Sequence, residues 1–254
     1  MIKALFKHIY KYYKDTFILA IAGVVIGVLV GIIDAGFGLG LNACTAIRTK
    51  YFWYLIWFLP LGGVFVWFIY HQFGKSVANG MKMVFHVGLG KNSKLPIRMV
   101  PLAVIGTWTT HLFGGSAGRE GVAVQIGAAV SNNVGRLVDK TIDIENSRKM
   151  FLITGMAAGF SGLFCTPLAA IFFALEVLVA GKLEYHALIP ATVASISAAF
   201  TSRALGLRKF HINILETLNY HPSTYNAVFL LKLAAMGLCF GIVGSLFALI
   251  LRYL

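Results

Sequence analysis

The chain of 254 residues is 58% hydrophobic and only 12% charged, and its formal net charge is +13. Soluble domains carry about 25% charged residues, so this composition excludes an ordinary soluble domain and predicts a polytopic membrane protein. The excess of basic residues fits cytoplasmic loops that contact anionic lipid, so the lipid bilayer rather than nucleic acid is the expected partner. Three cysteines without a Cys-x-x-Cys pair indicate neither a disulfide framework nor a metal site, and no cofactor is expected.

The first third of the chain predicts an interfacial helix and two membrane spans. Residues 1–15 alternate apolar and basic side chains at about helical spacing, which predicts an amphipathic helix on the cytoplasmic side. Thr16 to Ile33 is uncharged and close to the ~20 residues that a spanning helix needs, and its glycines recur every four residues, which favours close helix packing. Asp34 is expected to close this run, where it caps the helix or faces protein near an interface, and Tyr51 to Phe73 predicts the second span.

After a basic, polar region from Lys75 to Arg98, the apolar segments become short. They cover Met99 to Phe113, Val122 to Val134, Met150 to Gly162, Leu168 to Ala180 and Leu188 to Phe200. Paired short apolar segments interrupted by glycine are typical of the discontinuous helices of transporters. The polar stretches 136–149 and 202–223 are expected to be loops, and Tyr225 to Leu254 predicts a last long helix.

The stretch Gly118-Arg119-Glu120-Gly121-Val122 places a positive and a negative side chain between two glycines inside apolar sequence. Ionisable residues at membrane depth are costly and indicate a functional site. Glu120 would head a helix, whose amides and positive dipole end attract anions. A carboxylate there can occupy an anion site when charged and vacate it when protonated, which predicts a gate for proton-coupled anion movement. The alternative is a structural Arg119–Glu120 ion pair, although adjacent residues rarely pair well on a helix.

Two further acidic or nucleophilic positions need interpretation. The run from Gly114 to Gly118 matches the Gly-x-Ser-x-Gly pattern of hydrolases, which suggests an intramembrane serine hydrolase using Ser116 with His111 or His186 as base. No acidic residue is evidently placed to orient a histidine, so an enzyme is not expected. Glu176 lies in another apolar run, where a bond to a backbone donor is at least as plausible as a role in transport.

The run from Gly118 to Gly127 resembles the gating-glutamate motif of the CLC chloride channel and transporter family. Phe164 to Glu176 is similar to the family's Asn-Ala-Pro-Leu-Ala-Gly helix that ends in glutamate, and Ala78 to Lys82 occupies the place of its Gly-Ser-Gly-Ile-Pro anion-binding loop. The resemblance implies an all-α, polytopic CLC-type membrane fold, a homodimer, and transport of anions and protons with Glu120 as gate and proton carrier. The anion-binding residues that it implies are Asn79, Gly80, Met81, Gly118, Arg119, Gly121 and Val122.

Three departures from the family pattern bear on the anion. Val122 replaces the usual proline, Asn79 replaces the serine that coordinates chloride, with Met81 just beyond, and Val177 stands where exchangers often carry a proton-relay glutamate. Together they resemble the fluoride-exporting CLC branch, the bacterial fluoride/proton antiporters, and so imply a bacterial inner membrane protein. A chloride channel or chloride/proton exchanger of the same fold is the alternative.

The resemblance covers residues 16–223 as the first of two inverted CLC halves and residues 224–254 as the start of the second. The anion site of such transporters is built from both halves. We therefore expect the chain to be the N-terminal portion of a transporter and to lack transport activity alone. A non-transporting fragment that assembles with a partner is the structural alternative.

Overall fold

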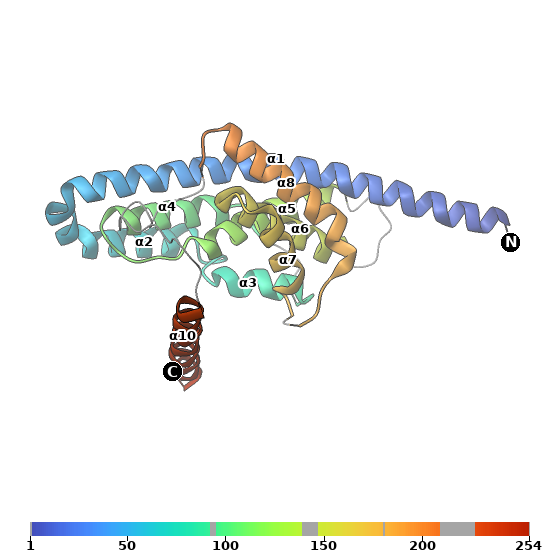
Figure 1. Cartoon of the computed structure of the whole chain (residues 1–254). Coiled ribbons are helices and arrows are strands. Elements are labelled where there is room, and N and C mark those ends of the chain that lie inside the picture. The colour runs from blue at the N-terminus through green and yellow to red at the C-terminus, as the bar shows by residue number, and fades with distance from the viewer. Residues whose placement is uncertain (1, 92–94, 139–146, 180, 209–226, 254) are drawn as a thin grey trace. The chain divides into compact units, whose positions relative to one another are not determined.

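The computed structural model describes residues 2–91, 95–138, 147–179, 181–208 and 227–253, with side chains from residue 13 onward. These residues form two compact units, Met1–Lys209 and Phe210–Leu254, and each is described by itself. The described part of the chain is helical and contains no strand. The first unit holds α1 (Ile2–Leu55), η1 (Ile56–Phe58), α2 (Leu59–Phe73), α3 (Gly80–Gly88), α4 (Met99–Leu112), α5 (Glu120–Val138), α6 (Ser147–Phe164), α7 (Pro167–Glu176), η2 (Tyr185–Ala187) and α8 (Leu188–Ala204) (Figure 1).

The helix α1 runs for 54 residues, interrupted only by non-helical dihedral angles at Tyr51. At 1.5 Å per residue it is about 80 Å long, and residues 2–15 are its first turns. The prediction that the run closes at Asp34 is wrong, because Asp34 lies inside α1. The expectation that Asp34 faces protein agrees with its complete burial. The helix continues because no proline occurs before Pro60 and the apolar face persists beyond Asp34, where Phe37 is buried.

The glycine stripe of α1 packs against α8, as its spacing predicts. A Cβ on Gly23 would lie 2.9 Å from the carbonyl oxygen of Pro190, and one on Gly31 would lie 2.7 Å from that of Ala198. The two backbones therefore approach more closely than any side chain on α1 would allow. Figure 1 shows α8 crossing the middle of α1.

The short helices occur where they were predicted, but three extend further and one is shorter. The helix α5 continues to Val138, α6 covers Ser147–Phe164, α8 continues to Ala204, and α7 ends at Glu176. Polar residues near the end of α5 are compatible with the helix because Asn133 donates to the carbonyls of Ala129 and Leu95, at 2.7 and 3.1 Å. The predicted break before α7 is confirmed, since Cys165 has φ of 54°.

The centre of the first unit is a close crossing of α5 and α6. Cβ atoms on Gly127 and Gly159 would collide with the carbonyl oxygens of Gly155 and Ala123. This backbone-to-backbone contact fixes the start of α5 against the last turns of α6, and both helices are buried along most of their length. The buried polar residues Ser161 and Thr154 satisfy their hydroxyls with the carbonyls of Ser195 and Met150.

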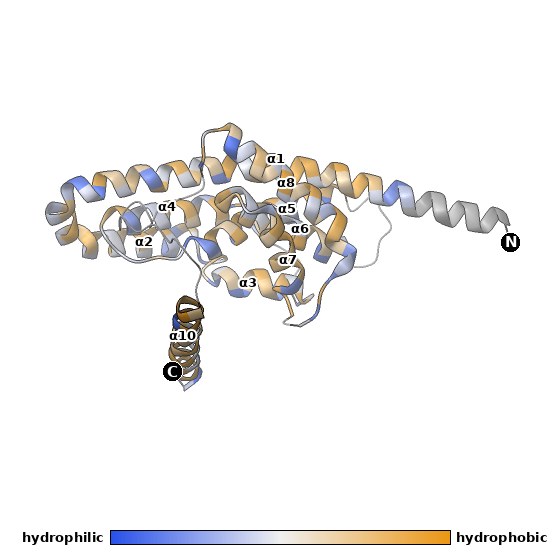
Figure 2. Ribbon diagram, in the orientation of Figure 1, coloured by the Kyte–Doolittle hydropathy of each residue, from blue (hydrophilic) through white to orange (hydrophobic). Residues whose placement is uncertain are grey.

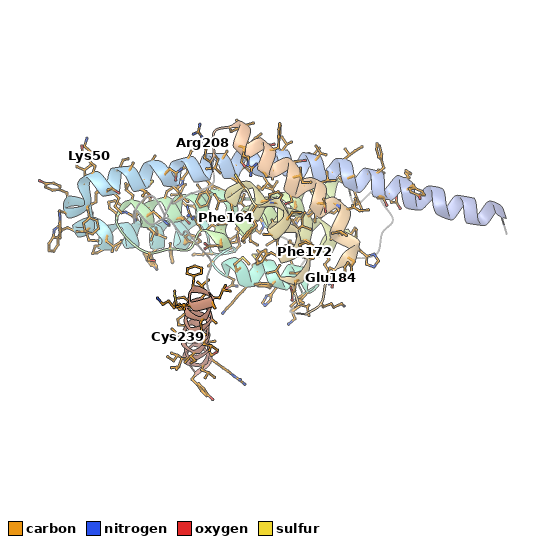
Figure 3. The ribbon with its side chains drawn as sticks, in the orientation of Figure 1. Lys50, Phe164, Phe172, Glu184, Arg208 and Cys239 are labelled. Carbon is orange, nitrogen blue, oxygen red and sulfur yellow. The ribbon has the colours of Figure 1, made fainter. Side chains whose placement is uncertain are left out.

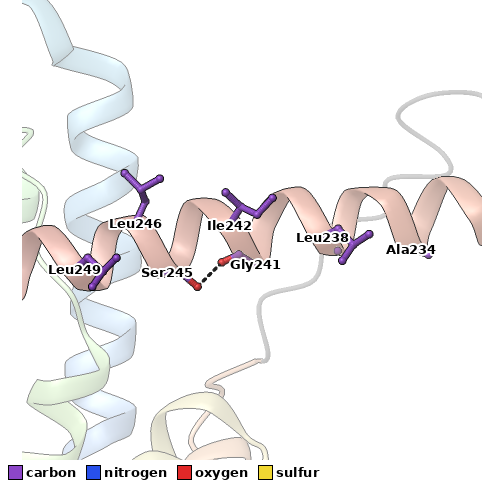
Figure 4. A pocket seen from close by; sticks show the side chains of 8 residues that line it. Ala234, Leu238, Gly241, Ile242, Ser245, Leu246 and Leu249 are labelled. Carbon is purple, nitrogen blue, oxygen red and sulfur yellow. Dashed lines mark hydrogen bonds between the residues drawn. The ribbon is translucent and has the colours of Figure 1, made fainter.

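The second unit contains α10 (Ala227–Tyr253), which accounts for most of the last predicted helix. The proposed boundary at residues 223 and 224 falls outside the described residues. One face of α10 forms a shallow groove around Gly237, Gly241 and Ser245, and the Ser245 hydroxyl donates to the carbonyl of Gly241 at 2.8 Å (Figure 4).

Two described segments are long and apolar enough to cross a membrane, Tyr13–Phe73 and Ala227–Tyr253. The ribbon of both is coloured mainly as hydrophobic in Figure 2, and many of their large apolar side chains are exposed. The remaining apolar helices are shorter, which agrees with the predicted pattern of broken helices.

Candidate functional site

The charged pair predicted from the sequence lies at the start of α5. The helix α4 ends at Leu112, and the glycine-containing stretch that follows leads into Glu120, the first residue of α5. The amide of Ala123 donates to the carbonyl of Arg119 at 3.0 Å. The amides of Glu120, Gly121 and Val122 precede this bond, so they have no partner inside α5 and form the positive end of its dipole.

The carboxylate of Glu120 folds back over this helix start. Its Oε2 atom lies 3.2 Å from the position that a Cβ on Gly118 would occupy, so Gly118 provides the space for it. Glu120 is exposed and makes no hydrogen bond or ion pair with any described residue. A negative charge therefore sits where the helix favours an anion, and no side chain holds it there.

The first residues of α3, Gly80 and Met81, lie against the first turns of α5. A Cβ on Gly121 would lie 3.6 Å from Cγ of Met81, and one on Gly80 would lie 3.6 Å from Nε2 of Gln125. Gly80 has φ of +48°, a left-handed conformation that favours glycine. Asn79 is exposed and its side chain does not cap α3.

Arg119 is placed by an aromatic side chain and not by Glu120. Its guanidinium lies over the ring of Phe164 at 5.8 Å from the centroid. The Phe164 ring in turn packs against Phe160 at 4.8 Å, and Phe160 packs against Phe173 at 4.9 Å. The alternative of an Arg119–Glu120 ion pair finds no support in the described residues. Figure 3 shows Phe164 in the middle of the first unit.

The glycine stretch before Arg119 borders a groove of about 410 Å³. Arg48, Thr49, Phe52 and Gly114 line it. The guanidinium of Arg48 donates to the carbonyl of His111 at 3.3 Å, close to the end of α4. The groove next to the glycine stretch therefore carries the fixed positive charge of Arg48.

The other predicted residues do not form the hydrogen bonds that a serine hydrolase would need. Ser116 is exposed and hydrogen-bonds neither His111 nor His186; the Nδ1 atom of His111 bonds instead to the carbonyl of Thr107 at 3.0 Å. Glu176 ends α7 and accepts a bond from the amide of Gly181 at 3.1 Å. Its predicted bond to a backbone donor is thus present, although the side chain is exposed.

Two residues that contact the site, Phe164 and Gln125, were not predicted from the sequence. Both lie in stretches that resemble family motifs, but only the fold shows that the Phe164 ring lies under Arg119. Gln125 could have been found from helix geometry, because it is four residues after Gly121 and therefore lies on the same face of α5.

A family profile described as voltage gated chloride channel matches residues 62–254. The chain belongs to the CLC family. Its similarity to a chloride/fluoride channel protein of Pseudomonas syringae pv. tomato is 38% identity over 230 residues, which are 91% of this chain and 49% of that protein. An H(+)/Cl(−) exchange transporter ClcA of Salmonella paratyphi B is 33% identical over 163 residues, or 61% of this CLC chain and 32% of that protein.

Solved CLC structures match the fold described above. The crystal structure of a CLC-type fluoride/proton antiporter superposes with a TM-score of 0.79 at 45% identity, covering 91% of this chain and 56% of that one. A slow cyanobacterial Cl−/H+ antiporter superposes with a TM-score of 0.68 at 18% identity, which shows the shared fold alone. The predicted family and all-α fold are confirmed, and the chain spans about half the length of the first of these relatives.

Proposed function

We propose that this CLC chain carries the gate of an anion/proton antiporter that exports fluoride. The arrangement at the start of α5 gives this proposal its main support. There, backbone amides without partners inside the helix lie next to the carboxylate of Glu120, which has no partner among the described residues.

Glu120 acts as gate and proton carrier in this proposal. While it is charged, its carboxylate competes with a free anion for the positive end of α5. A proton removes that charge, the attraction to the helix start falls, and the side chain swings away. Anion arrival and proton binding are thereby coupled at a single carboxylate.

The anion is held by the helix start and by the loop before α3. The amides near Gly121 and Val122 supply donors from α5, and Asn79, Gly80 and Met81 form the facing wall. Gly118 leaves room for the carboxylate, and Arg119 adds a fixed positive charge held over Phe164.

Fluoride is favoured over chloride for two reasons. Asn79 offers a side-chain amide at the position where the CLC family motif has a serine hydroxyl. Fluoride is small and strongly hydrated, so its binding site must replace the lost water with hydrogen-bond donors. The similar antiporter structure at 45% identity is described as a fluoride/proton antiporter. Chloride transport by the same fold is the competing proposal, because one similar protein is described as a chloride exchanger.

We further propose a homodimer in a bacterial inner membrane, with the N-terminus in the cytoplasm. The basic residues of the first 15 positions support this orientation, since cytoplasmic segments are enriched in Lys and Arg.

The test is proton flux driven by a fluoride gradient in liposomes containing the full-length protein. Glu120→Gln should abolish fluoride-coupled proton movement, because glutamine cannot carry a proton through the cycle. Glu184→Gln is the matched control and should retain coupling, since the Glu184 carboxylate is engaged in an ion pair with Lys149 at 2.6 Å. Unchanged coupling in Glu120→Gln would refute the gate, and equal competition by chloride would favour the chloride proposal.

A further inference from the structure

Asp34 is a buried carboxylate that the gate does not use. It lies inside α1 with 0% exposure, and neither of its oxygens has a hydrogen-bond partner. Its Oδ2 atom lies 2.5 Å from the position that a Cβ on Gly162 would occupy, so the side chain points at the backbone of α6. An uncompensated charge in such a place costs several kcal/mol.

The surroundings disfavour the charged form for a second reason. Gly162 lies in the last turn of α6, which ends at Phe164, and carbonyls at a helix end carry the negative side of its dipole. The carbonyl of Ser161 is used by the amide of Cys165 at 2.8 Å. A carboxylate beside these carbonyls is repelled, whereas a protonated carboxyl can donate a hydrogen bond to one of them.

Among the described residues, no cation pairs with Asp34. The helices packed on α1 carry these charged or titratable side chains: His111 on α4, Glu120 and Arg136 on α5, Arg148 and Lys149 on α6, and Arg203 on α8. None of them pairs with or hydrogen-bonds Asp34. The Arg203 guanidinium, near the same end of α6, donates to the carbonyl of Cys165 at 3.0 Å.

We propose that Asp34 holds a proton, so that a neutral carboxyl packs against the last turn of α6 at Gly162, and that this contact positions the gate. Gly162 and Phe164 belong to that turn, and the Phe164 ring supports Arg119 at the start of α5. Asp34 is thus a proton-binding positioning residue, distinct from the proton carrier Glu120. The effect of Asp34 on transport rests on the proposed function, whereas the protonated state of Asp34 is independent of it.

Loss of the Asp34 proton is expected to lower transport activity. At alkaline pH the carboxylate would face the carbonyl end of α6, and the turn that carries Phe164 would move away from α1. The protein therefore loses activity as pH rises, through a group that is not the gate.

Infrared spectroscopy of the full-length protein labelled with carboxyl-¹³C aspartate tests the proton directly. We expect an isotope-shifted band of a protonated carboxyl at neutral pH, which Asp34→Asn removes and Asp15→Asn leaves in place. Asp15 is a suitable control because it is another labelled aspartate of α1. Absence of an aspartate-specific protonated band in the wild-type protein overturns the proposal, whether or not the variants fold.

The pH profile of fluoride transport separates positioning from mere packing. Asp34→Asn keeps the shape and can donate a hydrogen bond, so its rate should stay within about twofold of wild type at neutral pH and should persist where the wild type declines. Asp34→Ala should slow transport by roughly two- to tenfold at every pH. An alkaline decline that is the same in wild type and Asp34→Asn contradicts the positioning role. If the wild type carries no fluoride, the proposed function fails while the infrared result stands.

Discussion

At the residue scale, Arg119 and Phe164 join two helices that are distant in sequence. The guanidinium lies 5.8 Å from the ring centroid, and such a contact contributes about 0.5–1 kcal/mol at an exposed site. This is enough to bias the start of α5 towards one arrangement, but too little to lock it. The residue next to the gate is therefore restrained and still able to move.

Phe164→Leu should reduce fluoride turnover by about two- to fivefold, because it removes the aromatic face and keeps an apolar side chain. The rate of fluoride efflux from liposomes measures this effect. Phe172→Leu is the matched control, since Phe172 is 61% exposed and does not take part in the Arg119 contact. Equal rates for the wild type and Phe164→Leu would show that the contact does not restrain the gate.

Glu184 gives a second prediction at this scale. The hydrogen bond from Lys149, at 2.6 Å, lowers the pKa of Glu184 below its ordinary value, and the charges of Lys149, Lys182 and His186 act in the same direction against burial. The charged form is thus favoured by folding, so its stabilisation is present above the unfolded-state pKa and is lost as pH falls through the lower folded-state pKa.

Glu184→Gln should lower the free energy of unfolding by about 1 kcal/mol or less at neutral pH. The difference from wild type should shrink below pH ~4, as the wild-type carboxylate becomes protonated. Thermal unfolding in detergent across a pH series measures it. A difference that is independent of pH would mean that packing, and not the ion pair, is lost.

Much of the site could be predicted at the residue scale. Glu120 and its flanking glycines stand out because ionisable residues are rare in apolar sequence, and Gly80 to Met81 follow from the family motif. The support by Phe164 could not be predicted, because it depends on how α6 ends relative to α5 and the two residues are far apart in sequence.

At the element scale, the α5–α6 crossing determines where the gate lies. Gly127, Gly155 and Gly159 bring the two backbones into contact, so the start of α5 has no freedom to slide along α6. Close-packed interiors accept added volume poorly.

Gly127→Ala should destabilise the protein by about 1–3 kcal/mol, because its methyl group would overlap the carbonyl of Gly155. Gly36→Ala is the control, since a Cβ on Gly36 meets nothing within 4 Å and alanine favours the helix. Melting temperatures in detergent compare them. Equal melting temperatures for the two variants would contradict the tight crossing.

The positions of the helices could be predicted from the apolar runs of the sequence, but the lengths of the helices could not. Asp34 was expected to end a span because charges normally mark interfaces, yet α1 buries it against Gly162 and continues. The pattern of single residues shows which side chains are costly in a membrane. It does not show that another helix covers them.

At the scale of the whole molecule, the chain covers 56% of the fluoride/proton antiporter structure that it resembles. Transporter sites in such folds lie where two repeats meet. We therefore expect residues 1–254, which cover about half of that structure, to show no fluoride-driven proton flux when reconstituted alone in liposomes. Robust flux from residues 1–254 would show that one repeat is sufficient.

The glycine stripe of α1 also has a consequence for biosynthesis. Its partner helix α8 follows about 170 residues later, and a ribosome adding ~5–20 residues per second needs roughly 10–30 s to reach it. During that interval the small-residue face of α1 is already in the membrane without its partner. Lipid, the insertion machinery or another helix must cover it, so slowed synthesis between α1 and α8 would favour misassembly over correct folding.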